Sequence, residues 1–175
     1  MTGLLLYGSL MDPDELAGYC RRDHPMSPVR VRGFRRSFCQ EPSWRNDEAI
    51  ERGVLTVRPS AADWFNAILV YGWEADVLAR LDHRERGYVR RSVPTSSVEP
   101  YQSEADLEAA GEAHVYTGRE ELRNESLRPN AEYLKLCSGA AARWGADFLD
   151  DFLSTTYVGR VPLRDFDIQT RRTGA

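Results

Sequence analysis

Two short stretches carry residue types that could take part in ligand binding and acid–base chemistry. The first is Tyr7-Gly8-Ser9-Leu10, where an apolar run breaks at a glycine and a helix begins shortly afterwards. Gly8 leaves room for a bound group beside the main chain, and the N–H groups of such a corner can converge on one point. We therefore expect a concavity that accepts a carboxylate or another oxyanion. Gly-Ser corners that bind no ligand are also common, so a purely structural turn is the alternative.

A phosphate suits this corner less well than a small carboxylate. Asp12, Asp14 and Glu15 follow the corner and already neutralise the positive end of the helix dipole. The corner also lacks the lysine that a phosphate-binding loop of the Walker type requires.

The second stretch ends at Glu85, which lies four residues after Leu81 and seven after Leu78. At helical spacing these positions share one face, so Glu85 continues an apolar stripe rather than the solvent face. Burial and the negative end of the helix would both raise its pKa, as a general base near neutrality requires. Arg84 and Arg86 would oppose this rise, although neighbours at i±1 point to other faces. The alternative is a glutamate of the last helical turn that simply pairs with an arginine.

The elements that position these two stretches are predicted from apolar patterns and end signals. Leu4–Tyr7 has bulky apolar residues in a row, which favours a strand buried on both faces. Asp12 is a suitable N-cap for a helix from Pro13 to about Cys20. A second helix is expected from Glu74 to about Arg86, with Gly87 as the C′ residue that ends it.

The rest of the chain indicates short strands with fewer helices. Further strands are expected at Val29–Arg32 and Phe34–Gln40 with a bend at Gly33, at Gly53–Val57 ended by Pro59, and at Ala67–Tyr71, Tyr88–Val93 and Ala113–Tyr116. Further helices are expected between Asn130 as the cap and Gly145 as the stop, and over Phe148–Leu153. Surface connections are expected at Glu41–Glu48, Glu99–Gly111 and Arg119–Pro129, followed by a loosely packed tail from Arg160.

Regular alternation of strands and helices is absent between Val29 and Tyr71. This argues against a purely parallel sheet. We predict an α+β fold, with a mixed, curved sheet or barrel of six or seven strands and helices packed outside. The length of 175 residues and the hydrophobic fraction of 42% predict a single domain over residues 1–175 with a substantial core.

Composition also excludes several classes of function. The net charge is −4 and the positive residues are dispersed, which argues against a nucleic-acid surface. No apolar run reaches the ~20 residues needed to cross a bilayer, and the N-terminal stretch lacks the basic start of a signal peptide. The three histidines have no metal-ligand spacing, so no metal is expected. Three cysteines without a CxxC pair fit reduced thiols, so we expect a cytoplasmic protein whose oligomeric state is open.

Together the two stretches resemble a known superfamily. Leu5–Leu10 resembles the YGSL signature of the γ-glutamylcyclotransferase superfamily. The segment Leu81–Tyr88, followed by Arg90 and Val93, is similar to that superfamily's run of Leu-Asp, catalytic Glu, nearby Tyr and a strand. Other matches occur in the same order, at Val31–Phe34, Gly53–Leu55, Ala113–Tyr116, Asn130–Leu134 and Gly139-Ala140. The resemblance spans about Leu4 to Leu153.

The resemblance implies a six-stranded mixed barrel with helices outside and a cavity floored by the YGSL loop. It implies an enzyme that cyclises γ-glutamyl compounds to 5-oxoproline and releases the attached amine, without metal or cofactor. In that enzyme Glu85 would be the acid–base residue, and Tyr88 matches the tyrosine that follows the glutamate. The residues implied to hold the glutamyl head group are Tyr7, Gly8, Ser9 and Leu10.

Departures from the superfamily pattern mean that the identity of the released amine does not follow from the resemblance. The stretch after Glu85 is short and poor in glycine, and Asn130 stands where members often have Ser. Free γ-glutamyl amino acids, glutathione and γ-glutamylamines are all candidate substrates. Two hypotheses from other classes are a non-catalytic carboxylate-binding module on the same fold and a partner-binding surface through Glu99–Gly111.

Overall fold

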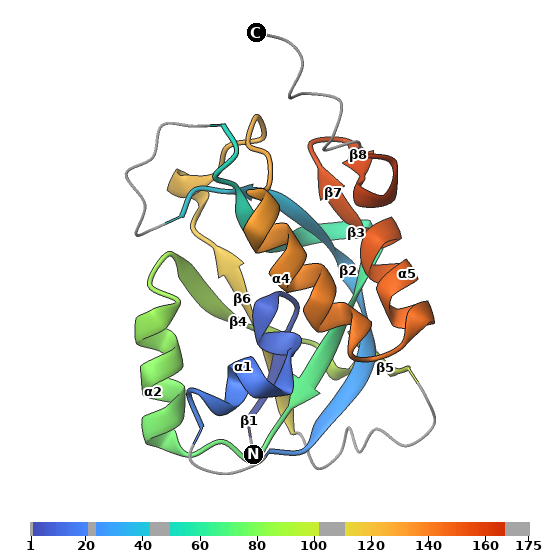
Figure 1. Ribbon diagram of the computed structural model, residues 1–175. Helices are drawn as coiled ribbons and strands as arrows, with labels where there is room; N and C mark the ends of the chain where they lie inside the picture. The colour runs from blue at the N-terminus through green and yellow to red at the C-terminus, as the bar shows by residue number, and fades with distance from the viewer. Residues whose placement is uncertain (1, 21–23, 43–49, 102–110, 167–175) are drawn as a thin grey trace, which may run out of the picture.

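The computed structural model describes residues 2–20, 24–42, 50–101 and 111–166 (Figure 1). Most of the loop expected at Glu41–Glu48 and of the connection expected at Glu99–Gly111 lies outside these residues, as does the end of the tail. The described strands form one eight-stranded sheet, and the described α-helices pack around it.

Strand β1 (Thr2–Leu6) is central to the sheet because it is paired on both sides. It runs antiparallel to β3 and parallel to β6, with Leu5 opposite Leu69 on one side and Val115 on the other. Its leucines are at most 4% exposed, as expected for a strand with apolar residues on both faces. The strand predicted at Leu4–Tyr7 is therefore confirmed, with its bounds shifted toward the N-terminus.

The chain leaves β1 through Tyr7 and Gly8 into a 3₁₀ turn, η1 (Ser9–Met11), and then α1 (Pro13–Ala17). The Asp12 carboxylate accepts a hydrogen bond from the N–H of Asp14 at 2.9 Å, which confirms Asp12 as the N-cap. The helix ends three residues before the predicted Cys20. Leu16 is its last buried residue, and Tyr19 and Cys20, which follow the helix, are partly buried against the core.

Strands β2 (Met26–Gln40) and β3 (Val54–Val70) form a long antiparallel pair. The prediction that Pro59 ends a strand is wrong, because β3 continues through it. Arg32 lies opposite Trp64 and Phe34 opposite Pro59, so five steps along β3 match only two along β2. Gly33 bends here with a φ of 84°. Pro59 is tolerated because its missing N–H falls at this irregularity in the ladder.

The sheet is mixed, as predicted, but it does not close into a barrel. The strand order is β4-β6-β1-β3-β2-β7-β8, with β5 added to β2, and the pairs β1–β6 and β2–β7 are parallel. Within the described residues no pairing joins the outer strands β4 and β8. The strands not yet defined are β4 (Tyr88–Val93), β5 (Val98–Pro100), β6 (Glu112–Gly118), β7 (Thr156–Val158) and β8 (Val161–Pro162). The short strands β5, β7 and β8 raise the number above the predicted six or seven.

The remaining α-helices within the described residues are α2 (Ala75–Arg84), α4 (Ala131–Ala142) and α5 (Ala146–Thr155). Helix α4 crosses in front of the sheet in Figure 1. The Asn130 side chain caps α4 by accepting hydrogen bonds from two backbone N–H groups at 3.0 and 3.3 Å. Gly145, with a φ of 107°, separates α4 from α5. The prediction that the tail packs loosely from Arg160 onward is wrong for its first residues, because Leu163 is only 5% exposed. None of the described helices is long and apolar enough to cross a membrane.

Candidate active site

Glu85 lies at the end of α2, at the entrance to β4. The helix stops at Arg84, and Glu85 has φ −85° and ψ 31° while its N–H still donates to the Leu81 carbonyl at 2.8 Å. The N–H of Tyr88 donates to the Glu85 carbonyl at 2.8 Å, which turns the chain directly into the strand. The prediction that Gly87 ends the helix as its C′ residue is therefore wrong, and Gly87 has no positive φ.

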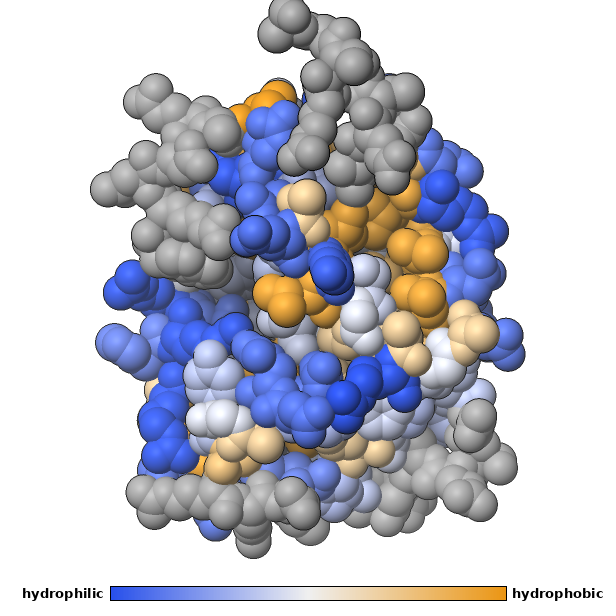
Figure 2. Space-filling model, viewed as in Figure 1, coloured by the Kyte–Doolittle hydropathy of each residue, from blue (hydrophilic) through white to orange (hydrophobic). Residues whose placement is uncertain are grey.

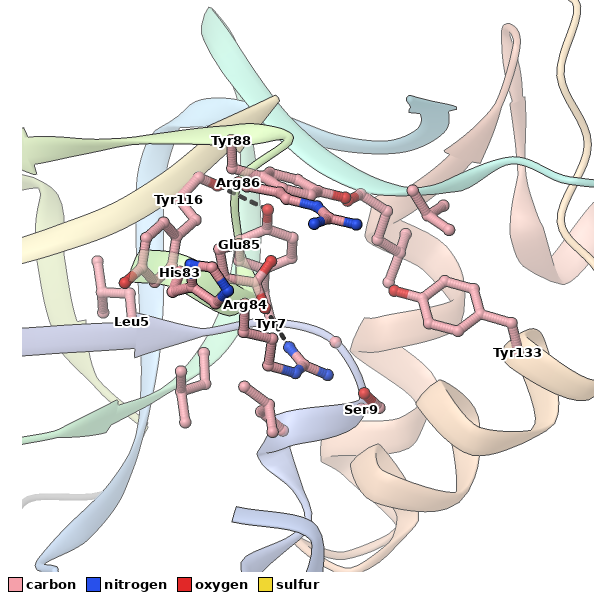
Figure 3. Close-up of a pocket in the computed structure, with 15 residues that line it drawn as sticks. Leu5, Tyr7, Ser9, His83, Arg84, Glu85, Arg86, Tyr88, Tyr116 and Tyr133 are labelled. Atoms are coloured by element: carbon pink, nitrogen blue, oxygen red, sulfur yellow. Dashed lines mark hydrogen bonds and ion pairs between the residues drawn. The ribbon is translucent and has the colours of Figure 1, made fainter. Parts of the chain in front are cut away.

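A cavity of about 450 Å³ lies between the end of α2, the loop after β1 and the start of α4 (Figure 3). It is lined by Leu5, Leu6, Tyr7, Gly8, Ser9, Leu10, Val54, Leu55, His83, Arg84, Glu85, Arg86, Tyr88, Tyr116 and Tyr133. Every residue singled out from the sequence, namely Tyr7, Gly8, Ser9, Leu10, Glu85 and Tyr88, contributes to it. Two stretches more than 70 positions apart in the sequence are thus brought to one site.

The Glu85 carboxylate faces this cavity and is largely removed from water. Its side chain is 15% exposed, and burial raises its pKa above that of an ordinary glutamate, against the opposing effect of Arg84. The inward orientation predicted from Leu78 and Leu81 is therefore confirmed. A carboxylate with a raised pKa can take up and return a proton closer to neutrality than an exposed one.

Arg84 contacts Glu85, contrary to the expectation that neighbours would point to different faces. Its Nη1 donates to the Glu85 carboxylate, and its Nε donates to the Tyr19 hydroxyl at 3.0 Å. The guanidinium also lies 5.0 Å from the centre of the Tyr19 ring. The expectation failed because Glu85 is beyond the last helical residue, so helical spacing no longer separates the two side chains.

The cavity tyrosines are held by hydrogen bonds to main-chain carbonyls. The Tyr7 hydroxyl donates to the Tyr116 carbonyl at 2.6 Å, and the Tyr88 hydroxyl donates to the Leu55 carbonyl at 2.7 Å. Burial raises the pKa of both phenols well above the usual value, so both stay protonated and keep donating. Tyr7 and Tyr88 are therefore rigid walls whose oxygens can still accept a hydrogen bond from a ligand.

Gly8 does not need a left-handed backbone, since its φ is −126°, but it keeps the loop free of a side chain at the cavity. A Cβ built there would lie 3.5 Å from the Tyr133 hydroxyl and 3.9 Å from Leu55, two residues that line the cavity. Within the described residues, the N–H groups of Gly8 and Leu10 donate to no protein acceptor, whereas that of Ser9 is directed at the Cys137 thiol. Two of the expected main-chain donors are therefore available to an anionic group.

Sequence reasoning missed several residues of the cavity. His83 and Arg86 flank the segment around Glu85, so their proximity to it could have placed them. Tyr133 follows the Asn130 cap by three residues, but only the packing of α4 against η1 brings its hydroxyl to Gly8. Tyr116 lies in β6, next to β4, and no local sequence signal connects it to the site.

Sequence reasoning also missed Arg36, which is fully buried next to the loop. Its Nε donates to Thr156 Oγ1 at 2.7 Å, its Nη1 donates to the Asn66 carbonyl at 2.7 Å and to the Tyr7 carbonyl at 3.5 Å, and its Nη2 donates to Asn66 Oδ1 at 2.7 Å. The guanidinium is 4.2 Å from the centre of the Phe152 ring. Burial lowers the pKa of Arg36 to about 9, which leaves it charged near neutrality.

Within the described residues, no group of three or more His, Cys, Asp or Glu side chains is placed to hold a metal ion.

Comparison with known proteins identifies the fold. No protein-family model and no curated protein matches the sequence, but solved structures do match. A γ-glutamyl cyclotransferase matches with 16% identity over 91% of this chain and 92% of that one, at a TM-score of 0.61. A glutathione-specific γ-glutamyl cyclotransferase from yeast matches with 17% identity over 88% and 94%, also at 0.61. An uncharacterized human protein matches with 17% identity over 86% and 85%, at 0.63.

These matches show that the chain has the γ-glutamyl cyclotransferase fold. The superfamily resemblance predicted from the YGSL and Glu85 segments is therefore confirmed at the level of the fold. Proteins with this fold include enzymes that act on γ-glutamyl compounds, such as the glutathione-specific yeast protein.

Proposed function

We propose that the protein is a cofactor-independent cyclotransferase that converts a γ-glutamyl compound to 5-oxoproline and releases the attached amine. The observation that carries this proposal is a largely buried glutamate with a raised pKa, Glu85, in the same cavity as the loop Tyr7–Leu10. The fold shared with γ-glutamyl cyclotransferases supports the choice of substrate class.

The proposed reaction needs one group that takes up a proton and later returns it. Glu85 accepts a proton from the α-ammonium of the glutamyl group, and the freed nitrogen attacks the γ-carbonyl carbon. A new C–N bond closes the five-membered ring and leaves the ring nitrogen with one proton too many. The old C–N bond breaks as Glu85 returns the first proton to the departing amine, and the ring nitrogen then passes its extra proton to that amine, which leaves as an ammonium ion. Atoms and charge balance without water or a redox partner. General acid–base catalysis of this kind contributes about 10²–10⁴-fold.

The loop after β1 would hold the glutamyl group in its reactive, bent form. The N–H groups of Gly8 and Leu10 can donate to the α-carboxylate or to the oxyanion that develops on the γ-carbonyl. Fixing the nitrogen next to the carbonyl carbon can lower the barrier by up to ~7–11 kcal/mol. The rigid walls formed by Tyr7 and Tyr88 favour one conformer of a flexible substrate.

A covalent route through a thiol is a poorer explanation of this site. Cys137 lies near Gly8, but burial raises the pKa of its thiol to about 12. A thiol that stays protonated near neutrality is a weak nucleophile. Cyclisation uses the substrate's own nitrogen as nucleophile, so no nucleophilic side chain is needed.

A second candidate function is a non-catalytic carboxylate-binding module. The ion pair between Arg84 and Glu85 favours it, because a paired glutamate can be purely structural. The test that separates the two is incubation with γ-glutamyl amino acids, glutathione and γ-glutamylamines, followed by an assay of free 5-oxoproline. Release from at least one compound supports the enzyme. Binding of the same compounds without release supports the module.

Gly8→Ala is expected to lower kcat/KM for the turned-over compound by about 10- to 100-fold, because misplacing the reacting group by a small distance carries a penalty of that order. The added methyl fits at ordinary contact distance, so the melting temperature should change little. Gly139→Ala on α4 is the matched control, since a Cβ there meets no atom within 4 Å. Equal values of kcat/KM for the two variants would show that the loop is not part of the binding site.

The pH profile of kcat/KM should report the state of Glu85. The base form of Glu85 is lost as the pH falls through its raised pKa. The acid limb of the profile, where kcat/KM falls with decreasing pH, is therefore expected at a higher pH than that at which an ordinary glutamate titrates. Arg84→Met removes the group that lowers this pKa, so the acid limb should move to still higher pH. Arg80→Met, one turn earlier on α2 and exposed, should leave the limb in place. A limb that Arg84→Met does not move would assign it to another group.

A further inference from the structure

A second cavity, of about 440 Å³, lies beside β3, β4, β6 and the 3₁₀ turn η3 (Glu120–Leu122), and its lining has an excess of positive charge. The charged residues that line it are Arg58, Arg91, Arg119, Arg123, Glu120 and Glu121. The fold thus gathers arginines that are dispersed along the sequence. Hydrophilic residues also cover the side of the molecule on which α2 and the start of β4 lie (Figure 2). A cavity of this volume can accept a small organic molecule.

The second cavity is separate from the one that contains Glu85. Side chains alternate between the two faces along a strand. In β4, Tyr88 lines the first cavity and Val89 the second, and in β6 the same holds for Tyr116 and Thr117. The two cavities therefore lie on opposite faces of the β4–β6 pair and share no described lining residue. A ligand in the second cavity is thus not the substrate of the proposed reaction.

Two of the arginines, Arg91 and Arg119, are held at Nε and have unused terminal nitrogens. Arg91 Nε donates to Thr117 Oγ1 at 2.9 Å, and Arg119 Nε donates to the Arg86 carbonyl at 3.2 Å. Within the described part of the chain, the terminal nitrogens of these two side chains have no acceptor and pair with no carboxylate. A planar guanidinium whose terminal N–H groups are unused can bind two oxygens of one phosphate group.

The other two arginines are already bridged by an anionic group of the protein itself. The Glu120 carboxylate accepts hydrogen bonds from Arg58 Nη1 and from Arg123 Nη1, the latter at 3.1 Å, and its side chain is 71% exposed. Two guanidinium groups are therefore close enough to share one acidic group, and that group can move out into water. Arg58 is largely buried, and its buried Nε has no hydrogen-bond partner among the described residues. A buried donor without an acceptor is rare in a native fold.

From these contacts we infer that the second cavity binds a small organic phosphate. Arg91 and Arg119 bind the phosphate oxygens, and the phosphate displaces the Glu120 carboxylate from Arg58 and Arg123. A phosphate monoester carries about 1.5 to 2 negative charges near neutrality, which matches the excess of four arginines over two glutamates in the lining. This inference does not depend on the proposed function.

The organic part of the ligand is indicated by apolar residues of the same cavity. Val57, Pro59 and Val89 belong to its lining, and Val89 is 37% exposed. Covering these side chains with the carbon-containing part of a ligand removes apolar surface from water and favours binding. Inorganic phosphate cannot cover them, so we expect it to bind more weakly than an organic phosphate.

The test is calorimetry on the full chain in a phosphate-free buffer, with AMP, inorganic phosphate and adenosine as probes. AMP should bind most tightly, inorganic phosphate more weakly, and adenosine not measurably. Arg91→Met should weaken AMP binding by about tenfold, the lower end for charge-assisted hydrogen bonds, because Arg91 is exposed. Arg90→Met is the matched control one residue earlier. Arg90 lies outside the cavity and pairs with Asp82 at 3.3 Å, so the affinity of the parent should be retained.

Glu120→Gln tests the displacement, because it should tighten AMP binding. Removing the competing carboxylate frees Arg58 and Arg123, and the loss of two exposed ion pairs corresponds to a gain of about fivefold. Glu121→Gln removes the same charge from the same lining. Within the described residues, Glu121 forms no ion pair with either arginine, so its effect should be smaller. Melting temperatures without ligand check that every variant folds.

Four results would each overturn the inference. They are no binding of AMP, binding of inorganic phosphate as tight as that of AMP, equal losses in Arg90→Met and Arg91→Met, and equal effects of Glu120→Gln and Glu121→Gln. None of these measurements uses the release of 5-oxoproline, so a failure of the proposed function would leave the inference standing, and the reverse also holds.

Discussion

Glu85→Gln is expected to lower the rate of 5-oxoproline release by about 10²–10⁴-fold, the usual contribution of a positioned acid–base group. The amide has the same shape as the acid but cannot take a proton from the α-ammonium or return it to the amine. The substrate affinity should persist, because the N–H groups of Gly8 and Leu10 are untouched. Steady-state kinetics with a compound that the parent turns over measures the rate, and calorimetry measures the affinity.

The control for charge is Glu112→Gln at the start of β6. Glu112 is 65% exposed and lies outside the cavity, so the same chemical change there should leave the rate of release near that of the parent. Circular dichroism and the melting temperature check that both variants fold. If Glu85→Gln turned over as fast as Glu112→Gln, another group would have to move the proton and the acid–base assignment of Glu85 would be lost.

Local patterns predicted the parts of this site that depend on nearby residues. The spacing of Leu78, Leu81 and Glu85 placed the carboxylate on the buried face, because a helix repeats its face every three to four residues. The same pattern could not show where the helix stops. The hydrogen bond from the Tyr88 N–H to the Glu85 carbonyl ends the helix early, and this brings Arg84 onto Glu85.

Features that depend on distant residues were beyond the sequence pattern. Pro59 ordinarily ends a strand, yet β3 passes through it because β2 is long enough to keep pairing on both sides of the irregularity. Tyr133 reaches the cavity only because α4 packs against η1. In both cases the deciding contact joins residues that are remote in sequence, and a single sequence does not reveal which remote segments meet.

Arg36 shows the same limit most clearly. Arg35 and Arg36 are adjacent in the sequence, and two consecutive arginines in a strand give no sign of which one is buried. In the fold, Arg35 is 41% exposed and pairs with Asp63 at 2.9 Å, whereas Arg36 is fully buried among neutral oxygens of β3, α5 and β7. Burying a guanidinium is tolerated only when many hydrogen bonds replace its water. The contacts of Arg36 supply them, and they join the end of β1 to the C-terminal elements.

Arg36→Met is expected to lower the free energy of unfolding by about 3–5 kcal/mol, since several buried acceptors lose their donor at once. Asn66 would lose two hydrogen bonds, and Thr156 and the Tyr7 carbonyl would lose one each. Urea unfolding followed by circular dichroism measures the change. Activity should fall in the folded fraction as well, because the Tyr7 carbonyl lies directly before Gly8 and the loop loses one of its supports.

Arg35→Met provides a control with the same change of side chain one residue earlier. Its ion pair with Asp63 is partly exposed, and such pairs contribute about 1 kcal/mol or less. Arg36→Lys keeps the charge but has a single donor group, so it should recover only part of the stability that Arg36→Met loses. Equal stability of Arg36→Met and Arg35→Met would contradict this account. It would mean that the neutral acceptors around Arg36 find other donors, and that the hydrogen bonds of Arg36 do not hold the site loop to the C-terminal part of the fold.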